Sequence, residues 1–174
     1  MKEIINAFDY AERITKELQE GILLNTCGEK FNSMVIGWGH LGVIWNRPTF
    51  TVYVRGSRYT KPQLDRTREF TLSVPLEGHL GKEVLRVCGS QSGRDLNKEI
   101  AASLTLVDAD EIHAPGILEY PLTLECRVLY QQDQVLLEVP KEIRHRFYSK
   151  GADEGDFHTA YIGEIVKAYI IREA

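Results

Sequence analysis

One short polar loop carries the side chains best suited to bind an anion. The run Arg55-Gly-Ser-Arg-Tyr-Thr60 supplies two guanidinium groups, and Ser57 and Thr60 add hydroxyls. Arginine forms forked, charge-assisted hydrogen bonds that match phosphate oxygens. Thr60 is expected to cap a short helix with Pro62 in its first turn, and a helix N-terminus favours an anion. The loop therefore predicts a phosphate site, and the competing interpretation is an exposed basic loop without a ligand.

A glycine cluster before this loop imitates a dinucleotide-binding motif. The run from Gly37 to Gly42 matches G-x-G-x-x-G. That motif requires a helix to begin at the third glycine and an acidic residue about 20 positions later. Here the strand-like run Val43-Ile44-Trp45 follows, and the later positions hold Arg58 and Tyr59. The context disfavours a Rossmann site and favours a glycine-rich strand end that a ligand or a second backbone approaches closely.

His158 is the one histidine considered for a catalytic role, because it stands directly before the last predicted strand. A lone histidine is nevertheless more often structural than catalytic. The other histidines and the cysteines show no metal-ligand spacing, so no metal site is predicted. Three widely separated cysteines also argue against a disulfide framework and favour small buried side chains. The four other histidines are His40, His79, His113 and His145, and the three cysteines are Cys27, Cys88 and Cys126.

Composition predicts a single globular domain over residues 1–174, with 43% hydrophobic and 26% charged residues. The net charge of −4 disfavours a nucleic-acid or acidic-membrane partner, although Arg47 to Arg68 forms a locally basic island. No apolar run approaches the roughly 20 residues of a membrane-spanning helix. Residues 1–21 are amphipathic and acidic, so no signal peptide is expected and a cytoplasmic location is predicted.

The phosphate loop and the glycine cluster must be positioned by strands, because strand patterns dominate the chain. Helical spacing joins Phe8, Ala11, Ile14 and Leu18 up to Gly21. Further helices are expected at 60–69 and around 82–87, and residues 141–158 are expected to be irregular. Many short strands with few helices predict a closed or sandwiched β architecture. The expected strands are 22–27, 31–38, 42–45, 49–55, 70–75, 104–109, 121–131, 135–140 and 159–171, with a turn at Asn46-Arg47-Pro48.

Six blocks, in order, resemble the flavin reductase-like, flavoredoxin-type family, and the likeness runs from about Gly21 to Ala168. The resemblance implies a mainly β fold, an FMN-binding split barrel with Greek-key topology and helical decorations. It also implies a homodimer with the flavin sites at the subunit interface. The blocks are Asn32-Ser-Met-Val-Ile-Gly-Trp-Gly39, Arg47-Pro48, Val54-Arg-Gly-Ser-Arg-Tyr-Thr60, Phe70-Thr-Leu-Ser-Val-Pro75, Cys88-Gly-Ser-Gln-Ser-Gly-Arg-Asp95 and His158-Thr-Ala-Tyr-Ile-Gly-Glu-Ile165.

The resemblance also implies a role for each site residue. One strand would line the isoalloxazine ring, largely through backbone groups, and the basic loop would take the ribityl phosphate. Two further segments would close the site, and His158 would stand near the ring or the incoming electron donor. The strand residues are Asn32, Met34, Val35, Ile36, Gly37 and Trp38, the loop residues are Arg55, Ser57, Arg58, Tyr59 and Thr60, and the closing residues are Ser92, Gly93 and Lys98.

Two departures from the family pattern affect this assignment. Val35 stands where the family commonly shows threonine, which removes one side-chain hydrogen bond to the flavin. Asn97 and Glu99 replace the usual aspartate and phenylalanine, which puts the packing on the flavin edge and the donor preference in doubt.

The phosphate-type loop beside a glycine-rich strand pair leads to a redox hypothesis. The protein is expected to bind FMN non-covalently, to take electrons from NADH or NADPH, and to pass them to a free flavin, a partner protein or a small acceptor. Two alternatives stay open: an FMN-binding electron carrier without NAD(P)H activity, and a non-catalytic dimeric binding module. A pyridoxamine-phosphate oxidase-like activity is disfavoured, because the loop resembles the flavoredoxin branch.

Overall fold

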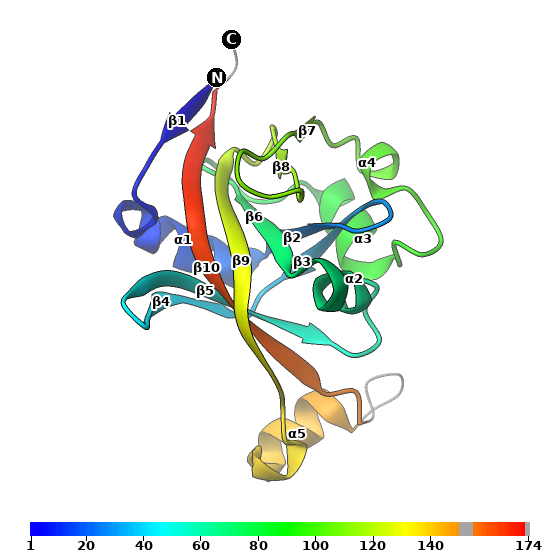
Figure 1. The fold of residues 1–174 in the computed structure, drawn as a ribbon. Helices are drawn as coiled ribbons and strands as arrows, with labels where there is room; N and C mark the ends of the chain where they lie inside the picture. Colours follow the sequence, from blue (N-terminus) through cyan, green and yellow to red (C-terminus); the bar gives the residue numbers. More distant parts are fainter. Residues whose placement is uncertain (150–154, 173–174) are drawn as a thin grey trace.

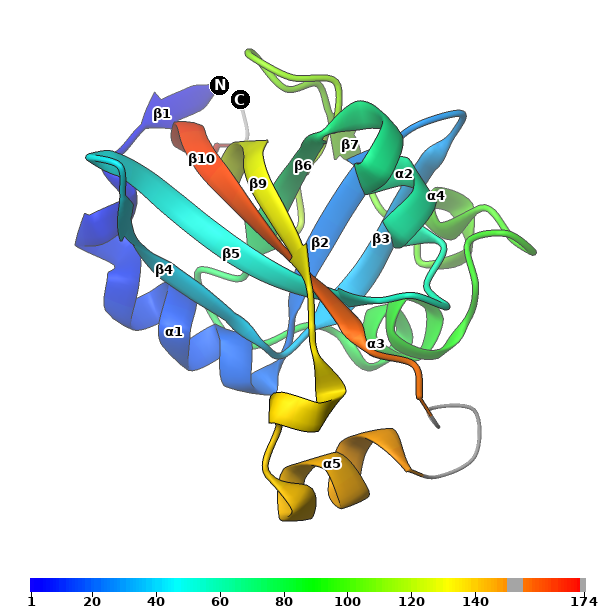
Figure 2. The same ribbon diagram turned by 60° about the horizontal axis from the view of Figure 1, so that its bottom comes forward.

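A strongly curved antiparallel sheet, with helices packed around it, forms the body of the protein in a computed structural model that describes residues 1–149 and 155–172 (Figures 1 and 2). The mainly β prediction is confirmed. Along the sheet the strands follow the order β3 (Phe31–Ile36), β2 (Ile22–Cys27), β6 (Glu69–Val74), β9 (Leu122–Asp133), β10 (His158–Ile171), β5 (Arg47–Arg55) and β4 (Gly39–Ile44), and β1 (Lys2–Ile4) pairs with the end of β10.

The two longest strands, β9 and β10, run side by side through the middle of the molecule (Figure 1). Their pairing is interrupted between Ile162 and Gly163 and again between Ile165 and Lys167. Such bulges bend a strand and increase its twist. Glycine is needed at the first of them, because a Cβ on Gly163 would lie 2.6 Å from the Phe70 ring. The bent pair carries β6 and β2 to one side and β5 and β4 to the other.

The two edges of the sheet are neighbours in sequence. β3 is one edge and β4 is the other, and only Gly37 and Trp38 connect them. Helix α1 (Ala11–Glu20) packs beside β4 at this opening (Figure 2). Within residues 1–149 and 155–172 no β-ladder joins β3 to β4, so the expected closed barrel is not confirmed. The connection leaves the outer backbone of β3 uncovered by a neighbouring strand.

Two apolar clusters stabilise this arrangement. The larger fills the concave side of the sheet, where Phe50, Val52 and Val54 are fully buried, which confirms the predicted alternation in β5. The smaller lies where α3 (Lys82–Ser90) covers β2 and β3, and it includes Leu23 and Val87. Shorter elements complete the chain: η1 (Ala7–Tyr10), α2 (Thr60–Thr67), α4 (Lys98–Ala101), β7 (Leu106–Val107), β8 (Gly116–Ile117), η2 (Leu136–Glu138) and α5 (Lys141–Tyr148).

Several local expectations were wrong. The strand expected at 135–140 does not form, and the short helix η2 lies at 136–138 within that range. Residues 141–148 form helix α5, whereas the rest of the predicted irregular segment at 150–154 lies outside the described residues. Trp45 and Asn46, with φ of 53° and 57°, make the hairpin turn, and Pro48 lies within β5.

Among the described residues, none of the helices has the length and apolar character needed to cross a membrane.

Candidate functional site

Three adjoining cavities lie along β3 and its connection to β4. The central cavity, of about 170 Å³, is lined by residues 34–38 with Tyr53, Arg55, Arg58 and His158. The cationic cavity, of about 160 Å³, shares Met34 and Arg58 with it and extends to residues 57–60 and 88–94 and to Lys98. The aromatic cavity, of about 560 Å³, shares Gly37, Trp38, Tyr53 and His158 with it and extends to α5. Every residue predicted for the site lines at least one of the three, and the predicted roles remain predictions.

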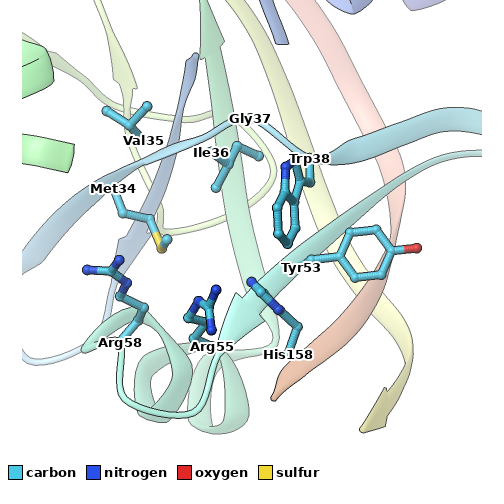
Figure 3. Close-up of a pocket in the computed structure, with 9 residues that line it drawn as sticks. All are labelled: Met34, Val35, Ile36, Gly37, Trp38, Tyr53, Arg55, Arg58 and His158. Carbon is cyan, nitrogen blue, oxygen red and sulfur yellow. The ribbon is translucent and has the colours of Figure 1, made fainter. Parts of the chain in front are cut away.

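The central cavity lies between a strand edge and a set of charged or aromatic side chains. Figure 3 shows Met34 to Trp38 on one side and Arg55, Arg58 and His158 across from them. The strand side comes from β3, whose only ladder in the described chain is with β2. Backbone N–H and C=O groups on its outer side therefore lack strand partners and can bind a flat polar ring.

The cationic cavity is built to receive negative charge. Arg58, Arg94 and Lys98 line it, and no aspartate or glutamate does so within the described residues. Buried Thr60 lies in the first turn of α2, where its Oγ1 accepts a hydrogen bond of 2.9 Å from Asn32 Nδ2. The Thr60 hydroxyl can still donate its own hydrogen to a ligand. The predicted N-cap role of Thr60 was wrong, since Tyr59 occupies the cap position.

Lys98 is a buried cation beneath this cavity. Asn97 begins α4 by accepting the Ile100 N–H, so asparagine serves here as the cap. Lys98, only 3% exposed, donates from Nζ to the carbonyl oxygens of Ser33 at 2.6 Å and Cys88 at 3.4 Å. Burial lowers the pKa of the Lys98 ammonium, the Cys88 thiol acts in the opposite direction, and the Arg58 charge lowers this pKa further. A bound anion would stabilise the charged lysine.

Gly93 permits a close approach between β3 and the 91–95 loop that follows α3. A Cβ at this position would overlap Asn32 Oδ1 and lie 3.0 Å from Tyr59 Cδ1. Asn32 Oδ1 is itself buried and has no hydrogen-bond partner among the described residues. This unsatisfied acceptor beside the cavity suits a ligand that carries hydroxyl groups as well as negative charge.

Two residues of the predicted phosphate loop are engaged by the protein itself. Arg55 donates to the carbonyl oxygens of Phe147 and Asp156, each at 3.0 Å, and its guanidinium lies 5.0 Å from the centre of the Tyr148 ring. Ser57 donates to the Asp156 carboxylate. These contacts tie the loop to the end of α5 and to the residues before β10.

The aromatic cavity has a different chemistry. Trp38 packs edge-on against Phe147, with the ring centres 5.2 Å apart, and the centres of the Trp38 and His158 rings are 5.0 Å apart. The Tyr148 hydroxyl and His158 Nδ1 are 2.8 Å apart and hydrogen bonded. Within the described chain, no lysine, arginine, aspartate or glutamate lines this cavity. Its walls therefore select by shape and by contact with aromatic faces.

Sequence reasoning missed several lining residues, and some of them had a visible signal. Arg94 directly follows Gly93 in a block already identified, and Tyr53 alternates with buried residues along β5. Phe147 follows Ile143 by one helical turn, a spacing that predicts a helix face. Tyr148 had no such signal, because its contact with His158 depends on the fold.

Comparisons with known proteins agree on one relationship. The family model described as "Flavin reductase like domain" matches residues 15–174. An uncharacterised protein of Archaeoglobus fulgidus is 29% identical over 165 residues, which cover 94% of this chain and 76% of that protein. A flavoredoxin from Methanosarcina acetivorans superposes with a TM-score of 0.62 at 25% identity, over 87% of this chain and 68% of that one. The NADH:FAD oxidoreductase SgcE6 of Streptomyces globisporus C-1027 superposes with a TM-score of 0.63 at 17% identity, over 87% of this chain and 75% of that one.

Proposed function

The chain belongs to the flavin reductase-like family, and we propose that it binds FMN and transfers electrons from NADH or NADPH through it to a flavin, protein or small-molecule acceptor. The observation that carries this proposal is the cationic cavity. Three cations and the Thr60 hydroxyl gather there, directly beside a cavity whose wall is an uncovered strand edge. A phosphate and a flat ring are the two parts of FMN that these surfaces suit.

The residues present fit FMN in three respects. Arg58, Arg94, Lys98 and Thr60 would hold the phosphate, because the cavity concentrates donors and excludes carboxylates within the described chain. The unpartnered Asn32 Oδ1 would accept a hydrogen bond from a ribityl hydroxyl. Val35 packs against the smaller apolar cluster, so a hydrogen bond to the flavin at this position would have to come from the backbone of β3.

FMN, when bound, supplies the hydride-accepting and electron-transferring chemistry. The chain supplies the surroundings. Trp38, Phe147 and Tyr148 form an aromatic wall on the side where an electron donor would approach. His158, held at Nδ1 by the Tyr148 hydroxyl, can hold or release a proton beside the central cavity.

The finer structural part of the proposal is a split barrel that works as a homodimer, with the sites at the subunit interface. Large apolar side chains near the open edges support this arrangement. Trp38, Val43 and Trp45 are 42%, 65% and 59% exposed. A second copy that covers these residues would also cover the mouth of the central cavity.

The visible spectrum of the purified protein tests FMN binding. The protein is expected to be yellow or to take up FMN at micromolar concentration after extraction of any bound flavin. A colourless protein that does not change the absorbance or fluorescence of added FMN would exclude the proposal.

One observation favours an electron carrier that does not react with NAD(P)H itself. The aromatic cavity contains no lysine or arginine in the described chain, so a dinucleotide pyrophosphate would find no ion-pair partner there. Against this, the similar Streptomyces protein is an NADH:FAD oxidoreductase. Stopped-flow reduction of the bound FMN by NADH and by NADPH separates the two functions, and a bound flavin that no donor reduces would indicate a non-catalytic binding module.

A further inference from the structure

The phosphate loop already holds an anion that comes from its own chain. The Ser57 backbone N–H donates to Asp156 Oδ1 at 3.1 Å, and the Ser57 hydroxyl donates to Asp156 Oδ2 at 2.6 Å. Gly56 faces the same carboxylate, since a Cβ there would lie 3.1 Å from Asp156 Oδ1. A backbone amide and a hydroxyl that converge on one anion are the donors expected to bind a ligand phosphate.

Ser57 lines the cationic cavity, so a phosphate in that cavity would lie beside the Ser57 N–H and hydroxyl, which already donate to Asp156. If the carboxylate stays in place, it repels the phosphate dianion across a short distance. If the carboxylate leaves, two hydrogen bonds to Ser57 are lost. Either way, Asp156 opposes binding of the phosphate and has little effect on binding of the flavin ring.

We propose that Asp156 is a specificity-determining residue, an internal anion that competes with the ligand phosphate for Ser57 and so limits the preference for FMN over riboflavin. This inference rests on the proposed function. Its consequence is that the flavin exchanges readily, as a diffusible substrate does. Arg55 and Gly56 are bonded to residues 156 and 157, so the competition occurs in a loop whose position is already fixed.

Removing the charge of Asp156 tests the competition. Asp156→Asn is expected to tighten FMN binding about tenfold, the change that corresponds to about 1.4 kcal/mol, and to leave riboflavin binding unchanged. Dissociation constants for both ligands are measured by flavin fluorescence quenching. Asp133→Asn is the matched control, because Asp133 also accepts a hydroxyl hydrogen bond, from Thr159, and does not line the cationic cavity. A ratio of FMN to riboflavin affinity that stays constant or falls in Asp156→Asn overturns the proposal.

A double-mutant cycle with Ser57→Ala distinguishes competition from simple anchoring. In the parent protein, Ser57→Ala is expected to change FMN affinity less than threefold, because the Ser57 hydroxyl already donates its hydrogen bond to Asp156. In the Asp156→Asn background the same change is expected to remove most of the gain. Equal effects in both backgrounds would overturn the inference. If Asp156→Asn does not fold, Asp156→Ala takes its place and is measured in the same way.

Inorganic phosphate separates this inference from the proposed function. Phosphate is expected to raise the Tm of Asp156→Asn more than that of the parent protein, whether or not flavin binds. Failure of every variant to bind flavin would exclude the proposed function, and the larger phosphate shift would still support Asp156 as the competitor. An equal phosphate shift in both proteins would contradict the competition itself.

Discussion

The cationic cavity and the aromatic cavity adjoin the same central cavity but differ in chemistry. The first gathers arginines, a lysine and hydroxyls from residues 57–60 and from the 88–98 segment, beside Asn32 and Met34 of β3. The second gathers aromatic rings from the Gly37–Trp38 connection, β5, β10 and α5. One end of the site is therefore expected to bind by charge and the other by shape. Substitutions at the two ends should then affect different parts of one ligand.

The largest effect is expected when charge is removed from the cationic cavity. Arg58→Ala combined with Arg94→Ala should weaken FMN binding about 100-fold, because two charge-assisted hydrogen bonds of about 1.5 kcal/mol each are lost. Riboflavin affinity should change less than about threefold. Isothermal titration with both ligands measures the difference. Arg86→Ala combined with Arg172→Ala is the charge-matched control, since these arginines pair with Glu83 and Glu3 and line none of the three cavities. Equal losses for both ligands would place the phosphate elsewhere.

The next effect concerns the shape of the same cavity. Gly93→Ala should destabilise the protein by about 2 kcal/mol and weaken FMN binding, because the new methyl group overlaps Asn32 Oδ1 and crowds Tyr59. Gly42→Ala is the control, since a Cβ there meets no atom within 4 Å. Denaturant unfolding measures both variants. A Gly93→Ala protein as stable as the control would show that the loop and β3 are not tightly packed.

A substitution in the aromatic cavity should change the rate of FMN reduction and leave FMN affinity unchanged. Phe147→Ala removes the ring that packs edge-on against Trp38. It is expected to slow reduction of bound FMN by NADH about tenfold, with the FMN dissociation constant unchanged within twofold, because the wall orients the donor and does not contact the phosphate. Stopped-flow absorbance gives the rate. A large loss of FMN affinity would show that the two ends are not independent.

The smallest effect is a pH dependence from Lys98. Its pKa is lowered in the folded protein from an ordinary value of 10.5, mainly by burial. Between the lowered pKa and 10.5 the unfolded chain binds the proton and the folded chain does not, so this lysine's contribution to stability rises with pH. The parent protein should therefore gain stability relative to Lys98→Met as the pH is raised through that window. Urea unfolding at pH 7 and at pH 9.5 measures this difference, and a difference that shrinks as the pH rises would contradict the assignment.

Much of the fold followed from near neighbours in the sequence. The alternation in β5, the β2–β3 hairpin and the end of α1 at Gly21 all depend on residues a few positions apart. The helix α5 was missed, although Ile143 and Phe147 have helical spacing, because charged residues and a following glycine indicated a loop. The absence of a β3–β4 ladder could not be predicted, since pairing across an opening depends on the curvature of the whole sheet.

In the site, the sequence indicated the side chains but not their partners. Arg55 was predicted to bind phosphate, yet its hydrogen-bond acceptors lie 92 and 101 positions away. Thr60 was predicted to cap a helix, yet it accepts from Asn32, which is 28 positions away. Spacing along a sequence reports on local conformation, whereas these contacts depend on which strands meet. The competition at Ser57 became visible only from the position of Asp156.

The place of β10 in the sheet has a consequence for biosynthesis. This strand lies between β9 and β5, and it follows all the other strands of the sheet in the sequence. The hairpins β2–β3 and β4–β5 can form while the chain is still being synthesised, but they belong to opposite sides of a sheet that only β10 joins. The nascent chain must therefore hold two incomplete half-sheets apart until residues 158–171 leave the ribosome. Truncation within this strand should yield a chain that aggregates or depends on chaperones, even though every residue of the cationic cavity is present.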